Sequence, residues 1–273
     1  FDGAEKDLVN PAPPTAHSQG TADTYTIDVD TYDGDPDSGG QLIDYVNTKV
    51  APIEGVLVSA TVDESLSFTV AGVTDDDQIH CNITRTASSP DSTAFSIPWG
   101  TIASTYAAAT HNAAQLLTVS TNALSGYKVY IEENDQMGRN GNVCTGATPA
   151  ADQYTFTAGI CIRDTACGVV ACDHQTSKDW TDMATYPGFG YSLNHVSGTD
   201  SEFNWDDSAT WQAKQIADQE ASESRSASTA EIMNNTAPVS GSSIDVCYRI
   251  AIPGTQPAGY YYNKIKYTAV ATF

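Results

Sequence analysis

Apolar and polar residues alternate in short segments along the whole chain, and the clearest example is segment 260–273. Its odd-numbered positions are Tyr261, Asn263, Ile265, Tyr267, Ala269, Ala271 and Phe273. Lysines and threonines predominate between them, and a period of two predicts a β-strand with one buried and one solvated face. Similar alternation predicts further strands at residues 24–32, 55–62, 66–73, 79–86, 116–121, 127–132 and 244–252. No segment has a sustained helical period, so we expect little helix.

This series of about a dozen short strands, separated by turn residues, predicts an all-β fold. We expect an immunoglobulin-like or jelly-roll β-sandwich, built as one sandwich or as two stacked ones. The strands at 116–121 and 127–132 are separated by a loop of hairpin length, so we expect them to pair.

The chain is expected to have three parts. Residues 1–22 contain several prolines and little alternation, which indicates an extended N-terminal arm. Residues 23–134 and 186–273 form the predicted sandwich. Residues 135–185 hold four of the cysteines and few alternating runs, which indicates a loop insertion stapled by disulfides in place of a core.

Composition restricts the location and the partners. The chain has 12 Lys and Arg against 34 Asp and Glu, a formal net charge of -22. Such a surface repels nucleic acids and anionic membranes, so neither is expected as a partner. No apolar run approaches the roughly 20 residues of a membrane span. Because no signal segment or initiator Met is present, we expect a mature secreted chain, cleaved just before Phe1.

The six cysteines are even in number, which indicates three disulfides and an oxidising, extracellular location. Spacing alone leaves many pairings open. The pairing that we favour is Cys144–Cys161, Cys167–Cys172 and Cys81–Cys247. Two of these cysteines, together with His174, could instead supply three zinc ligands, but no fourth ligand is evident and we favour the disulfide.

An acidic turn is the candidate metal site. Asp33, Asp35 and Asp37 alternate along it, and Asp44 follows eleven residues after Asp33. Carboxylates in this spacing can converge on Ca²⁺. The turn differs from an EF-hand loop, because Ser38 stands where glycine is expected. The alternative is a solvated acidic turn between two strands.

Other motifs are few. The sequons that begin at Asn82 and Asn234 permit N-glycosylation where the host has the machinery. No hydrolase, phosphate-binding or dinucleotide-binding motif is present, and the five histidines are scattered. We therefore predict that the protein is not an enzyme.

Three stretches carry a resemblance to a known group of proteins. They are residues 97–102 (IPWGTI), 114–129 (AQLLTVSTNALSGYKV) and 258–273 (AGYYYNKIKYTAVATF). In these stretches the chain resembles uncharacterised secreted all-β surface proteins of uncultured bacteria, and its last strand is similar to that of fimbrial and spore-coat subunits. The resemblance covers about residues 65–273. It implies a structural role at the cell surface and no catalytic residues.

The arm suggests how such a role would be performed. It precedes the strand with Tyr25, Ile27 and Val29 on one face, which could add to the sheet of a neighbouring copy. We expect a pilus-like filament formed by head-to-tail donor-strand addition. The alternative is a secreted carbohydrate-binding or adhesin module, in which aromatic side chains stack on sugar rings. Those aromatic residues are Trp180, Tyr186, Tyr191, Trp205 and Trp211.

Overall fold

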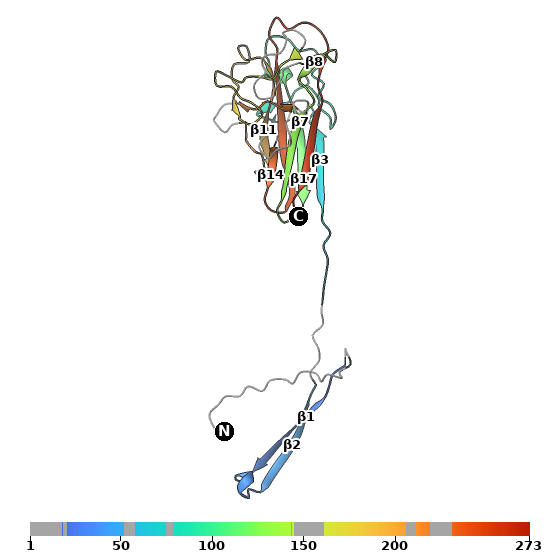
Figure 1. Cartoon of the computed structure of the whole chain (residues 1–273), viewed down its shortest axis with the longest axis vertical. Coiled ribbons are helices and arrows are strands. Elements are labelled where there is room, and N and C mark those ends of the chain that lie inside the picture. The colour runs from blue at the N-terminus through green and yellow to red at the C-terminus, as the bar shows by residue number, and fades with distance from the viewer. Residues whose placement is uncertain are drawn as a thin grey trace. The chain divides into compact units, whose positions relative to one another are not determined.

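The computed structural model (Figure 1) describes residues 18, 21–51, 58–74, 79–142, 144, 161–205, 211–218 and 231–273. The chain divides into two compact units, Phe1–Val62 and Asp63–Phe273. Strands dominate both units, so the prediction of an all-β fold is confirmed. Nearly all of the expected arm, residues 1–22, lies outside the described residues. The predicted boundary after residue 22 is wrong, because the first strand belongs to the first unit.

The first unit contains a β-hairpin. Strand β1 (Tyr25–Tyr32) pairs antiparallel with β2 (Leu42–Val50), and a 3-10 turn at Pro36–Ser38 lies between them. Each of the two strands is paired with the other alone among the described strands. This explains the shift of the domain boundary, since β1 contributes nothing to the sheets of the second unit.

The second unit is a sandwich of two sheets. The first sheet has the order β11 (Gly188–Ser197), β15 (Val239–Ala251), β6 (Asn112–Thr121) and β3 (Leu66–Gly72). In the second sheet, β7 (Tyr127–Glu133) is central, with β17 (Ile265–Ala271) on one side and β14 (Glu231–Asn235) and β13 (Ala217–Asp218) on the other. Apart from β13, which is parallel to β7, all of these strands pair antiparallel.

Shorter elements surround the sandwich. Strand β8 (Met137–Arg139) lies between β16 (Tyr261–Tyr262) and β9 (Cys161–Ile162). Two further pairs are β4 (Ile79–His80) with β5 (Ile83–Thr84), and β10 (Lys178–Asp179) with β12 (Gln212–Ala213). One short helix, α1 (Ala108–His111), precedes β6. In the described part of the chain, no helix is long and apolar enough to cross a membrane.

The main core lies between the two sheets. Leu117 and Val119 from β6 are fully buried in the same cluster as Val129 and Ile131 from β7. The alternating side chains of β11 and β15 complete this layer. The described residues thus form one sandwich, which is the first of the two arrangements expected from the sequence.

A second core covers the outer face of the first sheet. Cys247 and Ala251 of β15 point away from the main core and pack with Trp180 and Trp211. This explains why β15 is buried on both faces although its sequence alternates. Trp180 belongs to the Cys-rich insertion, so the described part of that insertion contributes to a core besides being stapled by disulfides.

Three local predictions are wrong. Strands β6 and β7 do not pair, because the loop between them carries the chain from one sheet to the other. The predicted strand at 79–86 is interrupted by a turn at Cys81 and Asn82, each of which has φ of 58°. Residues 58–62 of the predicted strand 55–62 are not in a strand, and 55–57 lie outside the described residues.

The last strand matches its predicted faces. Ile265, Tyr267 and Ala269 pack against the main core, whereas Lys264 and Lys266 are exposed. The alternation is continued by Tyr261 in β16, but β16 and β17 pair with different strands.

Candidate functional site

The hairpin of the first unit has one apolar and one mainly polar face. Ile27 and Val29 of β1 lie on the same face as Val46 of β2, which is opposite Val29 in the register. These three side chains are 40%, 49% and 58% exposed, respectively. The other face is mainly polar: it carries Asp28 opposite Asn47 and Asp30 opposite Tyr45, whose ring is exposed. The hairpin therefore presents apolar residues that nothing in its own unit covers among the described residues.

Such a hairpin is a weak structure by itself. An isolated two-stranded ribbon is at best marginally stable in water, because a single layer cannot bury its apolar face. The three predicted donor residues, Tyr25, Ile27 and Val29, lie on the apolar face, as expected from their alternation. One edge of β1 is already paired with β2, however, so β1 is part of a ribbon and is not a single free strand.

The acidic turn is held together by its own carboxylates. Asp35 accepts hydrogen bonds from the N–H of Asp37 at 3.0 Å and from the hydroxyl of Ser38 at 2.9 Å. Asp33 accepts a backbone hydrogen bond from across the turn, and Asp44 accepts one from the next residue. Within the described ranges, no three His, Cys, Asp or Glu side chains form a group that could hold a metal ion. The structure thus does not assemble the predicted Ca²⁺ ligands.

Two of the four sheet edges in the sandwich are covered. The outer side of β11 forms bridges with Asp164 and Lys214. The outer side of β14 is covered by residues 200–202, where the Glu202 N–H donates to the carbonyl of Ile232 at 2.9 Å. Covering an edge in this way prevents the addition of another strand.

The other two edges, β3 and β17, lie on one side of the sandwich and pair with no further strand among the described residues. Phe68 of β3 and Tyr267 of β17 meet there edge to face, with ring centroids 6.4 Å apart. The hydroxyl of Tyr267 also donates to Gln115 of the first sheet at 3.0 Å. This side of the sandwich is where the two sheets remain open.

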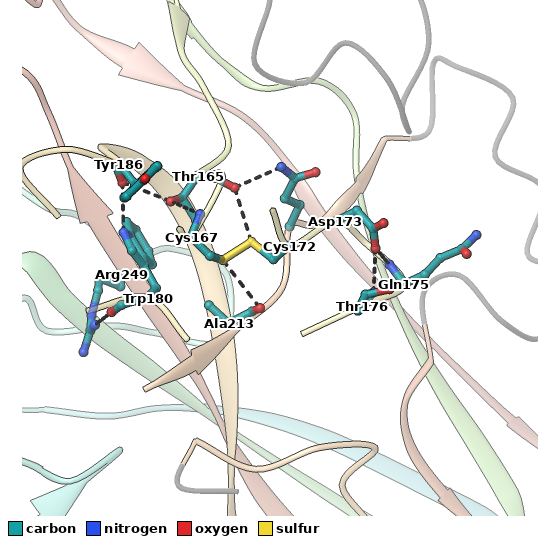
Figure 2. Close-up of a disulfide and its surroundings, with 11 residues drawn as sticks. Thr165, Cys167, Cys172, Asp173, Gln175, Thr176, Trp180, Tyr186, Ala213 and Arg249 are labelled. Carbon is teal, nitrogen blue, oxygen red and sulfur yellow. Dashed lines mark hydrogen bonds between the residues drawn. A yellow bond between two sulfur atoms is a disulfide. The ribbon is translucent and has the colours of Figure 1, made fainter. Parts of the chain in front are cut away.

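The cysteines form the pairs Cys81–Cys247, Cys144–Cys161 and Cys167–Cys172, which are the pairs expected from the sequence. Figure 2 shows the surroundings of the last pair. Thr165 accepts from the N–H of Cys167 at 2.9 Å, and its own hydroxyl donates to the carbonyl of Tyr186 at 3.0 Å. Because both sulfurs are in a disulfide, they cannot act with His174 as zinc ligands.

Aromatic residues of the second unit serve the core. The residues named above for sugar stacking are buried or half-buried, and they are Trp180, Tyr186, Tyr191, Trp205 and Trp211. The guanidinium of Arg249 lies 3.6 Å from the ring centroid of Trp211 and donates to the carbonyl of Trp180 at 3.0 Å. Burial lowers the pKa of Arg249 to about 10. The ring face of Trp211 is thus occupied from within the protein.

Glu133 and Asp164 lie together inside the second unit, although nothing in the sequence pattern indicates that they are neighbours. Glu133 and Asp164 are buried and interact with each other. Burial raises the pKa of Glu133 well above its usual range, and the charges of Asp164 and Asp218 add to this. Burial and Asp218 likewise raise the pKa of Asp164. Hydrogen bonds from the backbone of Ile216 and the side chain of Glu133 offset only part of the rise in the pKa of Asp164. Burial and the neighbouring carboxylates thus favour the protonated form of both side chains.

The two sequons lie in different environments. Asn82 is exposed in the turn between β4 and β5. Asn234 is half-buried in β14, and its amide donates to the carboxylate of Glu202 at 3.1 Å. Asn82 is thus the more accessible acceptor, and glycosylation at either position stays a prediction.

Comparison with protein-family models, curated proteins and solved structures finds no match to this chain. The resemblance to secreted bacterial surface proteins therefore stays a prediction. What the chain does has to be inferred from its own surfaces, and the uncovered hairpin and the open side of the sandwich are the most informative of these.

Proposed function

We propose that the chain is an extracellular structural subunit that assembles with copies of itself into a filament. The observation that carries the proposal is the hairpin β1–β2, which exposes Ile27, Val29 and Val46 on one face that no described segment of its unit covers. Burying these side chains against a neighbouring copy would supply the stabilisation that a two-stranded ribbon lacks. The three disulfides support a location in an oxidising compartment.

The proposal changes one part of the donor-strand hypothesis. A single strand inserted into a neighbour offers two free edges, whereas β1 already uses one edge for β2. The unit that docks would therefore be the hairpin, through an outer edge and its apolar face. The hairpin and its acceptor are different surfaces, so the contact is head to tail and leads to an open filament.

The alternative, a carbohydrate-binding module, is less well supported. The aromatic rings that would stack on sugars are used in packing, and Arg249 already lies on Trp211. A flat sugar-binding platform needs an exposed ring face, and none of these five residues is exposed.

The test compares two neighbouring residues on opposite faces of β1. Ile27→Asp places a charge on the apolar face, and Thr26→Asp places the same charge on the polar face, where Thr26 is exposed and opposite Lys49. We expect the wild type and Thr26→Asp to form filaments in negative-stain microscopy and fast-sedimenting species. Ile27→Asp, and a chain without residues 21–50, should remain monomeric. A wild type that stays monomeric at all concentrations would refute the proposal.

A further inference from the structure

The side of the sandwich between β3 and β17 has an incomplete core. Inward-facing Val129 and Ile131 of the central strand β7 are fully buried, but inward-facing Tyr267 and Ala269 of the adjacent β17 are only partly buried. In the other sheet, inward-facing Val70 of β3 is also only partly buried. Apolar side chains along this side thus remain accessible to another strand with an apolar face.

The backbone of β17 is available along its whole length. The N–H of Thr272 donates to Gly126 at 2.9 Å, and the carbonyl of Lys264 accepts from Asn134 at 3.0 Å, both toward the β7 side. Because bonding direction alternates along an antiparallel strand, the even-numbered residues between them also bond β7. The N–H and C=O groups of Ile265, Tyr267, Ala269 and Ala271 therefore point outward.

The rival edge, β3, also has no strand partner on its outer side among the described residues. The N–H of Val73, just beyond β3, donates to the hydroxyl of Ser92 at 2.8 Å, and the N–H of Ser92 donates to the carbonyl of Val73 at 3.0 Å. Val73 is odd-numbered like Ser65, so these bonds lie on the β6 side, where the Ser92 hydroxyl also donates to the carbonyl of Ala114. The two free edges differ in charge instead: β3 carries no charged side chain, whereas the outer face beside β17 carries Lys264 and Lys266.

The faces of the hairpin match those of β17. A strand added to β17 with its apolar face toward the core would place Ile27 and Val29 over the partly buried side chains. Its polar face, with Asp28 and Asp30, would then lie beside the outer face of β17, which carries Lys264 and Lys266. Lys266 already pairs with Glu132 at 2.8 Å, and no ion pair of Lys264 is found among the described residues. The orientation of the hairpin that buries Ile27 and Val29 would therefore also bring its aspartates close to the lysines of β17.

Resting on the proposed assembly function, we propose that the free edge of β17 is the acceptor for the hairpin of a second copy. The lengths agree, since β17 has 7 residues and β1 and β2 have 8 and 9. The added ribbon would extend the second sheet and cover the open side of the sandwich. Each copy would offer one hairpin and one β17 edge.

The test uses proline at positions whose N–H points outward. Ala269→Pro removes an outward donor from β17 and leaves the bonds to β7 intact, since proline is tolerated where a strand edge faces solvent. We expect it to raise the concentration needed for assembly about tenfold or more. Val70→Pro is the matched variant on β3: the Ser65 carbonyl accepts from Asn122 on the β6 side, so the Val70 N–H points outward. Val70→Pro should assemble like the wild type.

The outcomes separate this inference from the proposed function. If Ala269→Pro assembles normally while the chain lacking residues 21–50 does not, the acceptor is elsewhere and the assembly function stands. If Val70→Pro alone blocks assembly, β3 is the acceptor and the inference is wrong. If neither the deletion nor Ala269→Pro changes assembly, both proposals fail.

A second measurement does not depend on the folding of a proline variant. A photo-reactive benzoylphenylalanine at Val29, in a mixture of isotopically light and heavy full-length chains, should cross-link to residues 265–271 of a second copy. Mixed light–heavy peptides at this segment support the inference. Cross-links within one chain, or to residues 66–72, overturn it.

Discussion

Breaking the disulfide Cys81–Cys247 should destabilise the second unit far more than breaking Cys167–Cys172. The two disulfides lie in the same cluster of buried side chains, and all four cysteines are nearly inaccessible to solvent. Replacing either pair by alanine therefore removes similar atoms from similar surroundings. The difference lies in the length of chain that each bridge closes, which is 166 residues for the first pair and 5 for the second.

The expected magnitude follows from the entropy that a cross-link removes from the unfolded chain. Chain-entropy theory assigns about 5 kcal/mol to a closed segment of 166 residues and about 2 kcal/mol to one of 5 residues. The third bridge, Cys144–Cys161, spans 17 residues and falls between them at about 3 kcal/mol. The three alanine double variants should therefore rank in the order of these spans.

The assay is urea unfolding of each variant under non-reducing conditions, followed by tryptophan fluorescence. Trp180 and Trp211 lie in the cluster that contains the first two disulfides, so their emission reports on its unfolding. Equal losses of unfolding free energy for the two pairs would refute the entropic reasoning. So would a larger loss for Cys167–Cys172, which would indicate that its local hydrogen bonds matter more than the span that it closes.

Two further predictions concern the sandwich. Burial raises the pKa of Glu133 and Asp164, so the folded state retains protons that the unfolded chain releases, and stability should fall as pH rises from about 4 through the raised values. Asp164→Asn should flatten this decline, as seen in urea midpoints between acidic and alkaline pH, and an unchanged slope would contradict it. Gly126 has φ of 73° and an added Cβ would lie 1.9 Å from the carbonyl oxygen of Asn235, so Gly126→Ala should cost about 3 kcal/mol or more. Gly241 has φ of 69° with no atom within 4 Å of an added Cβ, so Gly241→Ala should cost only about 1 kcal/mol. Equal losses of unfolding free energy for the two variants would show that the Asn235 backbone moves away from the new Cβ at residue 126 without cost.

The stability of the hairpin β1–β2 is expected to depend on assembly. Val29 of β1 is opposite Val46 of β2, Ile27 is opposite Thr48, and no other described segment of their unit covers these side chains. In the proposed filament the hairpin would be stabilised by the neighbouring copy. Its isolated state would then be the least stable part of the chain, and amide exchange at β1 and β2 would slow on assembly.

Local features of the sequence were sufficient for several parts of the structure. The alternation in segment 260–273 correctly assigns Tyr267 and Ala269 to the core and Lys266 to the outer face. The alternation of Tyr25 to Val29 likewise predicts strand β1. Period-2 patterns succeed here because the face to which a side chain points depends only on its position along the strand. The cysteine spacing also indicated the short bridges, since nearby cysteines in a loop-rich region meet at little cost.

Strand partners could not be read in the same way. Strands β6 and β7 have the alternation and the short loop of a hairpin, but they belong to facing sheets. The same apolar faces suit both arrangements, so the loop alone could not distinguish between them. Strand β15 shows the converse difficulty, because Asp245 and Arg249 suggest a solvated face that a second core in fact covers. In hindsight, Asp245 and Arg249 at alternate positions of this long apolar strand were a signal in the sequence that charged side chains are buried here.

The amino-acid sequence by itself determined where several of the strands lie, which of their faces are apolar, and that the chain carries enough cysteines for three disulfides. Only the tertiary structure decided that Glu133 meets Asp164, that β1 is tied to β2, and that the sandwich is open between β3 and β17. The physical reason is range: side-chain direction is a local property of a strand. Sheet order, edge coverage and the proximity of buried charges depend on contacts between residues far apart in the chain.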